Sequence, residues 1–188
     1  MKRILVPVLV VAVLAGCGKD ESSSSSGGSS SGGSSSPGSS QKTPEEAFKD
    51  MQARILAKDG KGLWNFICEK SRKKMTESDE AKKGMDQLKA MPDEQLAEVV
   101  KTWGVTPAEL KKMSNEEIMI LNMNNMTKEE EEQKKARETK WKEVKIDGDK
   151  AVATTIEPDG KEEIVALVKE GGTWKIDIEE TEKIKEKK

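Results

Sequence analysis

Hydrophobic and polar positions repeat with two different periods along this chain, and the period changes near residue 139. From Thr43 onward, apolar side chains recur every three or four residues, which is the spacing of one helix face. Beyond Thr139 they recur at every second residue, which is the spacing of one strand face. The pattern therefore predicts an α+β fold, with N-terminal helices packed on a C-terminal antiparallel sheet.

The helical stretch is divided by repeated start signals, in which Ser or Thr precedes an acidic residue by three positions. These pairs begin at Thr43, Thr76, Thr106, Ser114 and Thr127. Both side chains of such a pair can bond to backbone N–H groups near the helix start, so each pair favours a new helix. We expect the first helix to end at Asp59-Gly60 and a second helix to run over residues 62–75. The predicted helices are therefore short and numerous.

Turn signals divide the last part of the chain into four strands. The signals are Asp147-Gly148, Pro158-Asp159-Gly160 and Gly171-Gly172. Because such residues favour tight turns, the four segments should form an antiparallel meander. The third segment, residues 164–168, is apolar at consecutive positions, which indicates burial on both faces or a central place in the sheet. The fourth carries Trp174, Ile176 and Ile178 on one face.

The chain begins with a segment that predicts export. Two basic residues precede an unbroken apolar run over residues 4–14, which is shorter than a transmembrane helix of ~20 residues. Leu14-Ala15-Gly16-Cys17 follows and resembles a bacterial lipobox. We predict a lipoprotein signal peptide over residues 1–16, cleavage between Gly16 and Cys17, and a diacylglyceryl lipid on the Cys17 thiol. An uncleaved anchor and an ordinary secretory signal are the alternatives.

A lipid on Cys17 would hold the chain at a membrane, since each buried methylene contributes ~0.8 kcal/mol. Gly18 stands where enterobacterial-type sorting places an aspartate for inner-membrane retention, which favours the outer membrane. Residues 17–42 continue mainly as serine and glycine, with almost nothing to bury. We expect a disordered linker there and a folded domain over residues 43–188.

Composition narrows the possible partners and chemistry. The formal net charge is −2, so the balance gives no electrostatic reason to expect nucleic acid as a partner. Histidine and tyrosine are absent, which removes the commonest metal ligand and two frequent acid–base groups. If Cys17 is acylated, Cys68 has no cysteine left with which to form a disulfide, and we expect it to be a small buried side chain.

Three segments resemble uncharacterised bacterial lipoproteins of the nuclear-transport-factor-2-like, or SnoaL-like, superfamily of cystatin-like cones. They are Thr43-Pro44-Glu45-Glu46-Ala47, Lys58-Asp59-Gly60 followed by Leu63-Trp64, and residues 168–176. The resemblance covers residues 43–75 and 139–179. It implies a cone-like domain in which residues 77–136 are a helical insertion, and it implies a fold rather than an activity.

Enzymes of that superfamily usually act through Asp/His or Asp/Tyr pairs, which this chain cannot form. We therefore predict no catalytic residue and no cofactor, and expect a noncatalytic envelope lipoprotein that binds another envelope protein or a small apolar ligand. The alternative is an isomerase- or hydrolase-like enzyme that uses a carboxylate in a pocket. Trp64, Trp141 and Trp174 are the candidate pocket residues, and core packing is the alternative role for them.

Two further groups of side chains have alternative interpretations. Met119, Met123 and Met126 share one helix face and could hold copper(I) in the periplasm, or could fill the core or line a partner groove. The acidic run of residues 129–132 points around a helix rather than toward one spot, so we expect a solvated face and no calcium site. We assign no metal ligand from the sequence.

Overall fold

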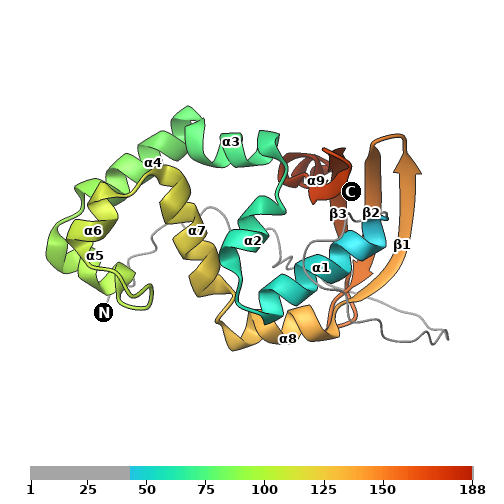
Figure 1. The fold of residues 1–188 in the computed structure, drawn as a ribbon, viewed down its shortest axis with the longest axis horizontal. Helices are drawn as coiled ribbons and strands as arrows, with labels where there is room; N and C mark the ends of the chain where they lie inside the picture. The colour runs from blue at the N-terminus through green and yellow to red at the C-terminus, as the bar shows by residue number, and fades with distance from the viewer. Residues whose placement is uncertain (1–42, 188) are drawn as a thin grey trace. The chain divides into compact units, whose positions relative to one another are not determined.

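Helices precede a C-terminal antiparallel sheet in the computed structural model, which describes residues 43–187 (Figure 1). The predicted signal peptide, Cys17 and the linker lie outside the described residues. The helices are α1 (Pro44–Leu56), α2 (Gly60–Asn65), α3 (Glu69–Glu77), α4 (Asp79–Ala90), α5 (Asp93–Val100), α6 (Pro107–Lys112), α7 (Asn115–Met126), α8 (Glu130–Glu138) and α9 (Ile178–Glu186). The strands are β1 (Lys140–Asp147), β2 (Lys150–Ile156), β3 (Glu162–Glu170) and β4 (Thr173–Ile176). The predicted α+β class is confirmed.

The four strands form one antiparallel sheet in the order β1-β2-β3-β4, which confirms the predicted meander. β1 and β2 are paired along their length, and so are β2 and β3. β4 is short and pairs only with the C-terminal end of β3, beginning at Leu167↔Ile176. The turn between β3 and β4 consists of Gly171 and Gly172, both with the positive φ that glycine adopts readily. β3 lies between β2 and β4, so the predicted central position is confirmed.

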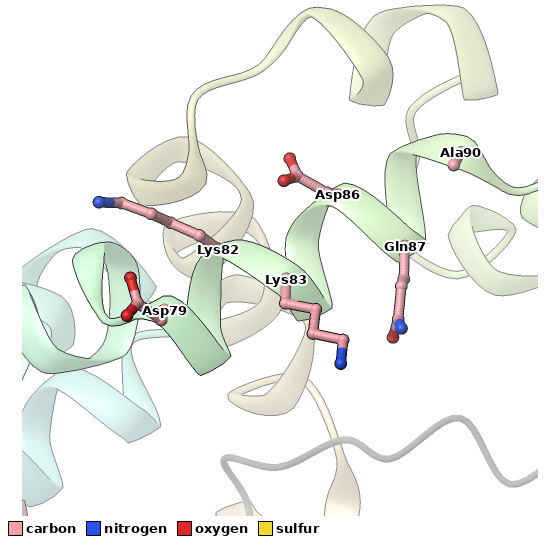
Figure 2. A pocket seen from close by; sticks show the side chains of 6 residues that line it. All are labelled: Asp79, Lys82, Lys83, Asp86, Gln87 and Ala90. Atoms are coloured by element: carbon pink, nitrogen blue, oxygen red, sulfur yellow. The ribbon is translucent and has the colours of Figure 1, made fainter.

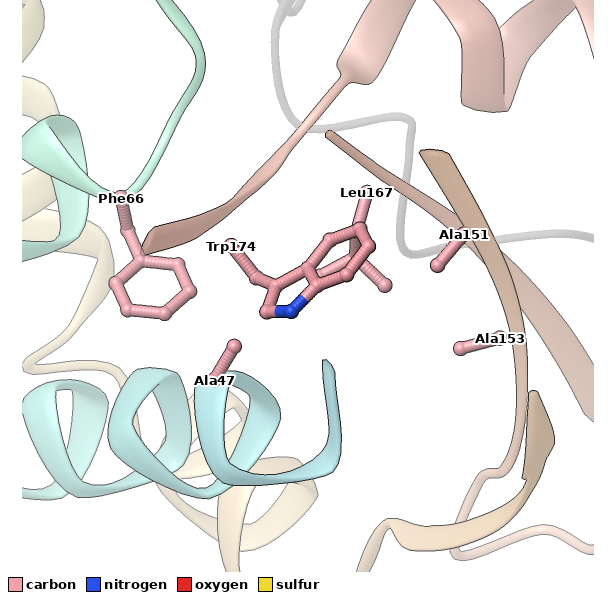
Figure 3. Packing of buried hydrophobic residues seen from close by; sticks show 6 residues of the cluster. All are labelled: Ala47, Phe66, Ala151, Ala153, Leu167 and Trp174. Atoms are coloured by element: carbon pink, nitrogen blue, oxygen red, sulfur yellow. The ribbon is translucent and has the colours of Figure 1, made fainter. Parts of the chain in front are cut away.

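One face of the sheet packs against α1 and the segment after α2. Its buried cluster consists of Ala47, Phe66, Ala151, Ala153, Leu167 and Trp174 (Figure 3). Met51, Trp141, Val144, Val165 and Ile176 are partly buried against this cluster. We call these eleven residues the sheet core. It joins residues from position 47 to position 176, so it can form only when the two ends of the domain meet.

The edge of the sheet beside β4 is closed by elements that are not strands. The backbone N–H of Cys68 donates to the Ile176 carbonyl, and the N–H of Ile176 donates to the Phe66 carbonyl, both at 2.9 Å. Where β4 has ended, the N–H of Ala166 on β3 donates to the Thr181 hydroxyl of α9 at 2.9 Å. These bonds occupy backbone groups that an open edge would offer to another chain.

Helices α4 to α7 are packed around a second core. Its buried members are Leu96, Val100, Leu110 and Ile118, and seven partly buried hydrophobic residues pack against them. We call these four residues the helical core. Two of the predicted capping boxes lie here, at Thr106 before α6 and at Ser114 before α7. Each box satisfies N–H groups at a helix start, so local bonds add to the apolar packing that holds these short helices.

Helix α7 reaches the sheet region through α2, and Gly60 permits this contact. The backbone N–H of Gly60 donates to the Asn124 side-chain oxygen of α7 at 2.9 Å. A Cβ at Gly60 would lie 2.6 Å from the Asn124 Cα, closer than real Cβ contacts come. The two helices can therefore lie at this separation only because residue 60 has no side chain.

The predicted second helix over residues 62–75 is wrong, because the chain forms two helices there. Asp59 does not end a helix; its side chain accepts the N–H of Gly62 at 2.8 Å and caps the start of α2. The chain reverses one residue earlier, at Lys58, whose φ is +58°. Phe66 still has helical backbone angles, but Ile67 pairs with Ile176 of β4 and Cys68 is extended, so α3 begins only at Glu69.

Three other boundaries also differ from the prediction. Thr76 lies within α3, and Ser78 is the cap of α4. Thr127 ends α7 instead of starting α8, and its buried hydroxyl donates to the Asn124 carbonyl at 3.1 Å. Ile178 belongs to α9 rather than to the fourth strand, because Asp177 caps a helix there. Among the described helices, none has the length and apolar character that crossing a membrane requires.

Candidate functional site

Trp174 lies at the centre of the sheet core and is 4% exposed. β4 places its ring against α1, beside Leu167 and the small side chains of Ala151 and Ala153 (Figure 3). Lys169 is paired with Trp174 across β3 and β4, and its ammonium lies 5.9 Å from the centre of the indole ring. A cation at this distance over an aromatic face is favourable. The ring is therefore held by apolar neighbours and by one cation.

The indole N–H of Trp174 is fully buried and has no hydrogen-bond acceptor among the described residues. Figure 3 shows the nitrogen on the side of the ring where Ala47 and Ala153 lie. A buried donor without a partner costs about 1–3 kcal/mol, which is why such groups are rare in folded proteins. This N–H is therefore the polar group of the sheet core whose missing partner needs an explanation.

The other two predicted pocket residues occupy different environments. Trp141 on β1 belongs to the sheet core, where its ring centre lies 5.4 Å from that of Phe48 on α1. Trp64 on α2 is 1% exposed, and its N–H donates to the carboxylate of Glu116 on α7 at 2.9 Å. The structure thus brings Trp141 and Trp174 into one cluster, while Trp64 is buried on α2 and bonded to α7.

Two glutamates that the sequence analysis did not single out also stand apart from the other acidic side chains. Glu132 on α8 is 7% exposed, and burial raises the pKa of its carboxyl above the usual range. Burial likewise raises the pKa of Glu157, which follows β2. The prediction of a solvated face over residues 129–132 is therefore wrong for Glu132, although Glu129, Glu130 and Glu131 are exposed.

Comparison of the chain with models of known protein families, with curated proteins and with solved structures finds no match. The resemblance to cystatin-like cones accordingly stays a prediction. Trp174 and the two glutamates have to be interpreted from their own chemistry and surroundings.

Cys68 is buried, as predicted, and belongs to a small polar cluster between helix starts. Its thiol donates to the Ser71 hydroxyl at 3.2 Å, and that hydroxyl donates to the Asp177 carboxylate at 3.3 Å. The N–H of Ile178 donates to the same hydroxyl at 3.1 Å. The cluster thereby ties the start of α3 to the start of α9, which is a structural role.

The methionines proposed for copper are largely enclosed. Met119 is 2% exposed and Met123 is 6% exposed, while Met126 at the end of α7 is partly buried. Within residues 43–187, no three Cys, Asp or Glu side chains are grouped in a way that could hold a metal ion. Copper binding through the three thioethers stays a prediction.

A shallow hollow of about 460 Å³ runs along the outer side of α4 (Figure 2). It is lined by Asp79, Lys82, Lys83, Asp86, Gln87 and Ala90. All six residues come from one helix and are exposed. Such mixed charges are typical of a solvated helix face. None of the three predicted pocket tryptophans lines this hollow.

Proposed function

We propose that this chain is a lipid-anchored binding protein of the bacterial envelope, and that its folded domain holds a small, mainly apolar ligand against Trp174. The lipobox and the Ser/Gly linker support the anchor, with Cys17 as the acylated residue and the outer membrane as the favoured location. The buried indole N–H without an acceptor supports the ligand site. We assign no catalytic residue in this proposal.

The surroundings of Trp174 define the chemistry of the ligand. Side chains of the sheet core are aliphatic or aromatic, so they favour an apolar molecule. The N–H adds one requirement, a hydrogen-bond acceptor such as a carbonyl, ether or carboxylate oxygen. A buried water is a poorer partner, because it needs two to four polar neighbours and the other buried side chains of the cluster around Trp174 are all apolar.

Native mass spectrometry of the full chain, extracted from membranes in mild detergent, tests the ligand. We expect the wild type to retain a small molecule that Trp174→Phe loses, because phenylalanine keeps an aromatic ring but has no N–H. Trp64→Phe is the matched control, since it removes an indole N–H that already has a partner in Glu116. A wild type without any bound molecule, or equal retention in the three proteins, would contradict the proposal.

Metabolic labelling with radioactive palmitate tests the anchor separately. We expect label on the wild type and none on Cys17→Ser, which should also leave the membrane fraction. Cys68→Ser should keep its label, because Cys68 lies buried in the folded domain. An unlabelled wild type would remove the anchor from the proposal and leave the ligand site untouched.

A second candidate function is the isomerase- or hydrolase-like enzyme with a carboxylate base. The observation in its favour is Glu132, a buried carboxyl with a raised pKa, which is a property of many catalytic acids and bases. A screen of small ester and carbonyl substrates tests it. Turnover that Glu132→Gln abolishes and Glu131→Gln retains would favour the enzyme, and absence of turnover would remove it.

A further inference from the structure

Glu132 occupies an unusual position for a carboxylate in this domain. It follows two exposed glutamates in the first turn of α8, yet its own side chain is only 10% exposed, against 80% for Glu131. The ammonium of Lys135 lies 3.9 Å from Glu132 and 4.0 Å from Glu131. Both distances are longer than a hydrogen bond, so burial of the Glu132 charge is only partly offset.

The charges around Glu132 are mostly of the same sign. On α8 they are Glu129 and Glu131, with Lys135 as the opposing charge. From the end of β2 comes Glu157, which is repelled by Glu132 and attracted by the same Lys135. Asp159 and Glu163, from the β2–β3 turn and β3, add negative charge near Glu157. One lysine therefore faces two partly or wholly buried carboxylates.

The remaining neighbour of α8 is α1, and it holds α8 through neutral groups. The Gln52 side chain on α1 donates to the carbonyls of Ala136 and Thr139, at 2.8 and 2.9 Å. Gln133 on α8 donates to the Ile55 carbonyl at 2.5 Å. Arg54 of α1 is engaged by Asp50 and Asp59. Uncharged hydrogen bonds thus hold α8 in place, and they do not compensate the charge of Glu132.

We propose that Glu132, Glu157 and Lys135 form a proton-sensitive group that holds α8 more firmly in mildly acidic surroundings than at neutral pH. Uptake of one proton by the two carboxyls changes the charge of the three side chains from −1 to zero. It chiefly removes the cost of burying a charged carboxylate, and the repulsion of Glu157 by Glu132 is a smaller contribution. Because α8 leads directly into β1, local opening of α8 should also affect the first strand of the sheet. This device is independent of the ligand proposed at Trp174.

The expected pH dependence follows from the direction in which the two pKa values move. Both carboxyls have a pKa above the ordinary glutamate range in the folded chain. The stabilisation by their protons is therefore complete below the ordinary range and is lost as the pH rises through the raised values.

Hydrogen exchange of the full chain at about pH 5 and about pH 7.5, corrected for the intrinsic exchange rate, measures this opening. We expect the amides of α8 to open several-fold more often at the higher pH. In Glu132→Gln the difference should largely disappear, because glutamine is neutral at both values. Glu131→Gln is the matched control, since Glu131 lies at a similar distance from Lys135 but is exposed. It should keep most of the difference, because it removes only one weak like charge and leaves the Glu132 carboxyl buried.

Carboxyl carbon NMR on the same proteins provides a second readout that does not depend on stability. We expect the Glu132 resonance to titrate above that of Glu131 in the wild type, and the Glu157 resonance to shift its midpoint downward in Glu132→Gln. Titration of Glu132 in the ordinary glutamate range would overturn the proposal. Equal exchange of α8 at the two pH values, or the same behaviour of Glu131→Gln and Glu132→Gln, would also overturn it.

Discussion

The sheet region and the helical region of this domain are stabilised in different ways. In the sheet region, the core joins Ala47 near the start of the domain to Trp174 near its end. In the helical region, α4 to α7 surround four buried side chains, and capping boxes next to the helices supply much of the order. Contacts between residues far apart in sequence fix one region, whereas packing among successive helices and their capping boxes supports the other, so the two should differ in cooperativity and in tolerance to change.

The same difference bears on function. A site that orients a ligand needs neighbours held in place from several directions, as Trp174 is by α1, β2 and β3. In contrast, α4 buries none of its residues, and its outer side carries exposed mixed charges. The comparison therefore favours the sheet region as the place of specific binding.

Truncation of one leucine in each core should give the largest effect. Leu110 is fully buried in the helical core, and Leu167 is 4% exposed in the sheet core. Each Leu→Ala change should cost about 2–5 kcal/mol of unfolding free energy. In hydrogen exchange, Leu110→Ala should expose mainly α4 to α7, whereas Leu167→Ala should expose amides throughout the domain. Identical exchange patterns would show that the two regions unfold as one.

A methyl group at Gly60 should give the next largest effect, because it would clash with the backbone of α7 at Asn124. We expect Gly60→Ala to destabilise the domain by about 1–3 kcal/mol, as overpacking does, in a urea titration followed by tryptophan emission. Gly84→Ala is the control, since nothing lies within 4 Å of a Cβ there. It should stabilise α4 by about 0.5–1 kcal/mol. Equal results for the two variants would mean that α2 and α7 do not need their close approach.

The smallest effect concerns Glu179, which joins α9 to α3. Hydrogen bonds from Lys183 and Lys70 lower its pKa to about 2. Its stabilisation is therefore present above the ordinary glutamate range and is lost as the pH falls toward 2. Because Lys70 is well exposed, the contribution should be about 1 kcal/mol or less. In thermal melts, the melting temperature of Glu179→Gln should fall less between about pH 5 and pH 2.5 than that of the wild type. The exposed Glu182→Gln should match the wild type.

Features with a local cause could be predicted from the sequence. The capping boxes at Thr43, Thr106 and Ser114 depend on residues three positions apart, and the turn at Gly171-Gly172 depends on two adjacent glycines. The start of α9 also had a local signal, since Asp177 is followed by two glutamates. The alternation of Trp174, Ile176 and Ile178 favoured a strand there instead.

Features with a tertiary cause could not be predicted. Nothing in Ile67 and Cys68 signals a break between α2 and α3, because their extended conformation depends on bonds to β4. Glu132 is one of four consecutive glutamates, and its burial depends on how α8 packs. For the candidate site, the sequence pointed to Trp174, but the state of its N–H follows only from the positions of all its neighbours.

The hydrogen bond proposed for Trp174 can be observed directly by NMR of the nitrogen-labelled full chain, extracted from membranes. The Trp174→Phe and Trp64→Phe variants assign the two indole N–H signals. Our account predicts a slowly exchanging Trp174 signal that moves upfield and exchanges faster after the chain has been unfolded and refolded without its ligand. The Trp64 signal, bonded to Glu116, should stay unchanged. A Trp174 signal that is the same before and after this treatment would contradict the account.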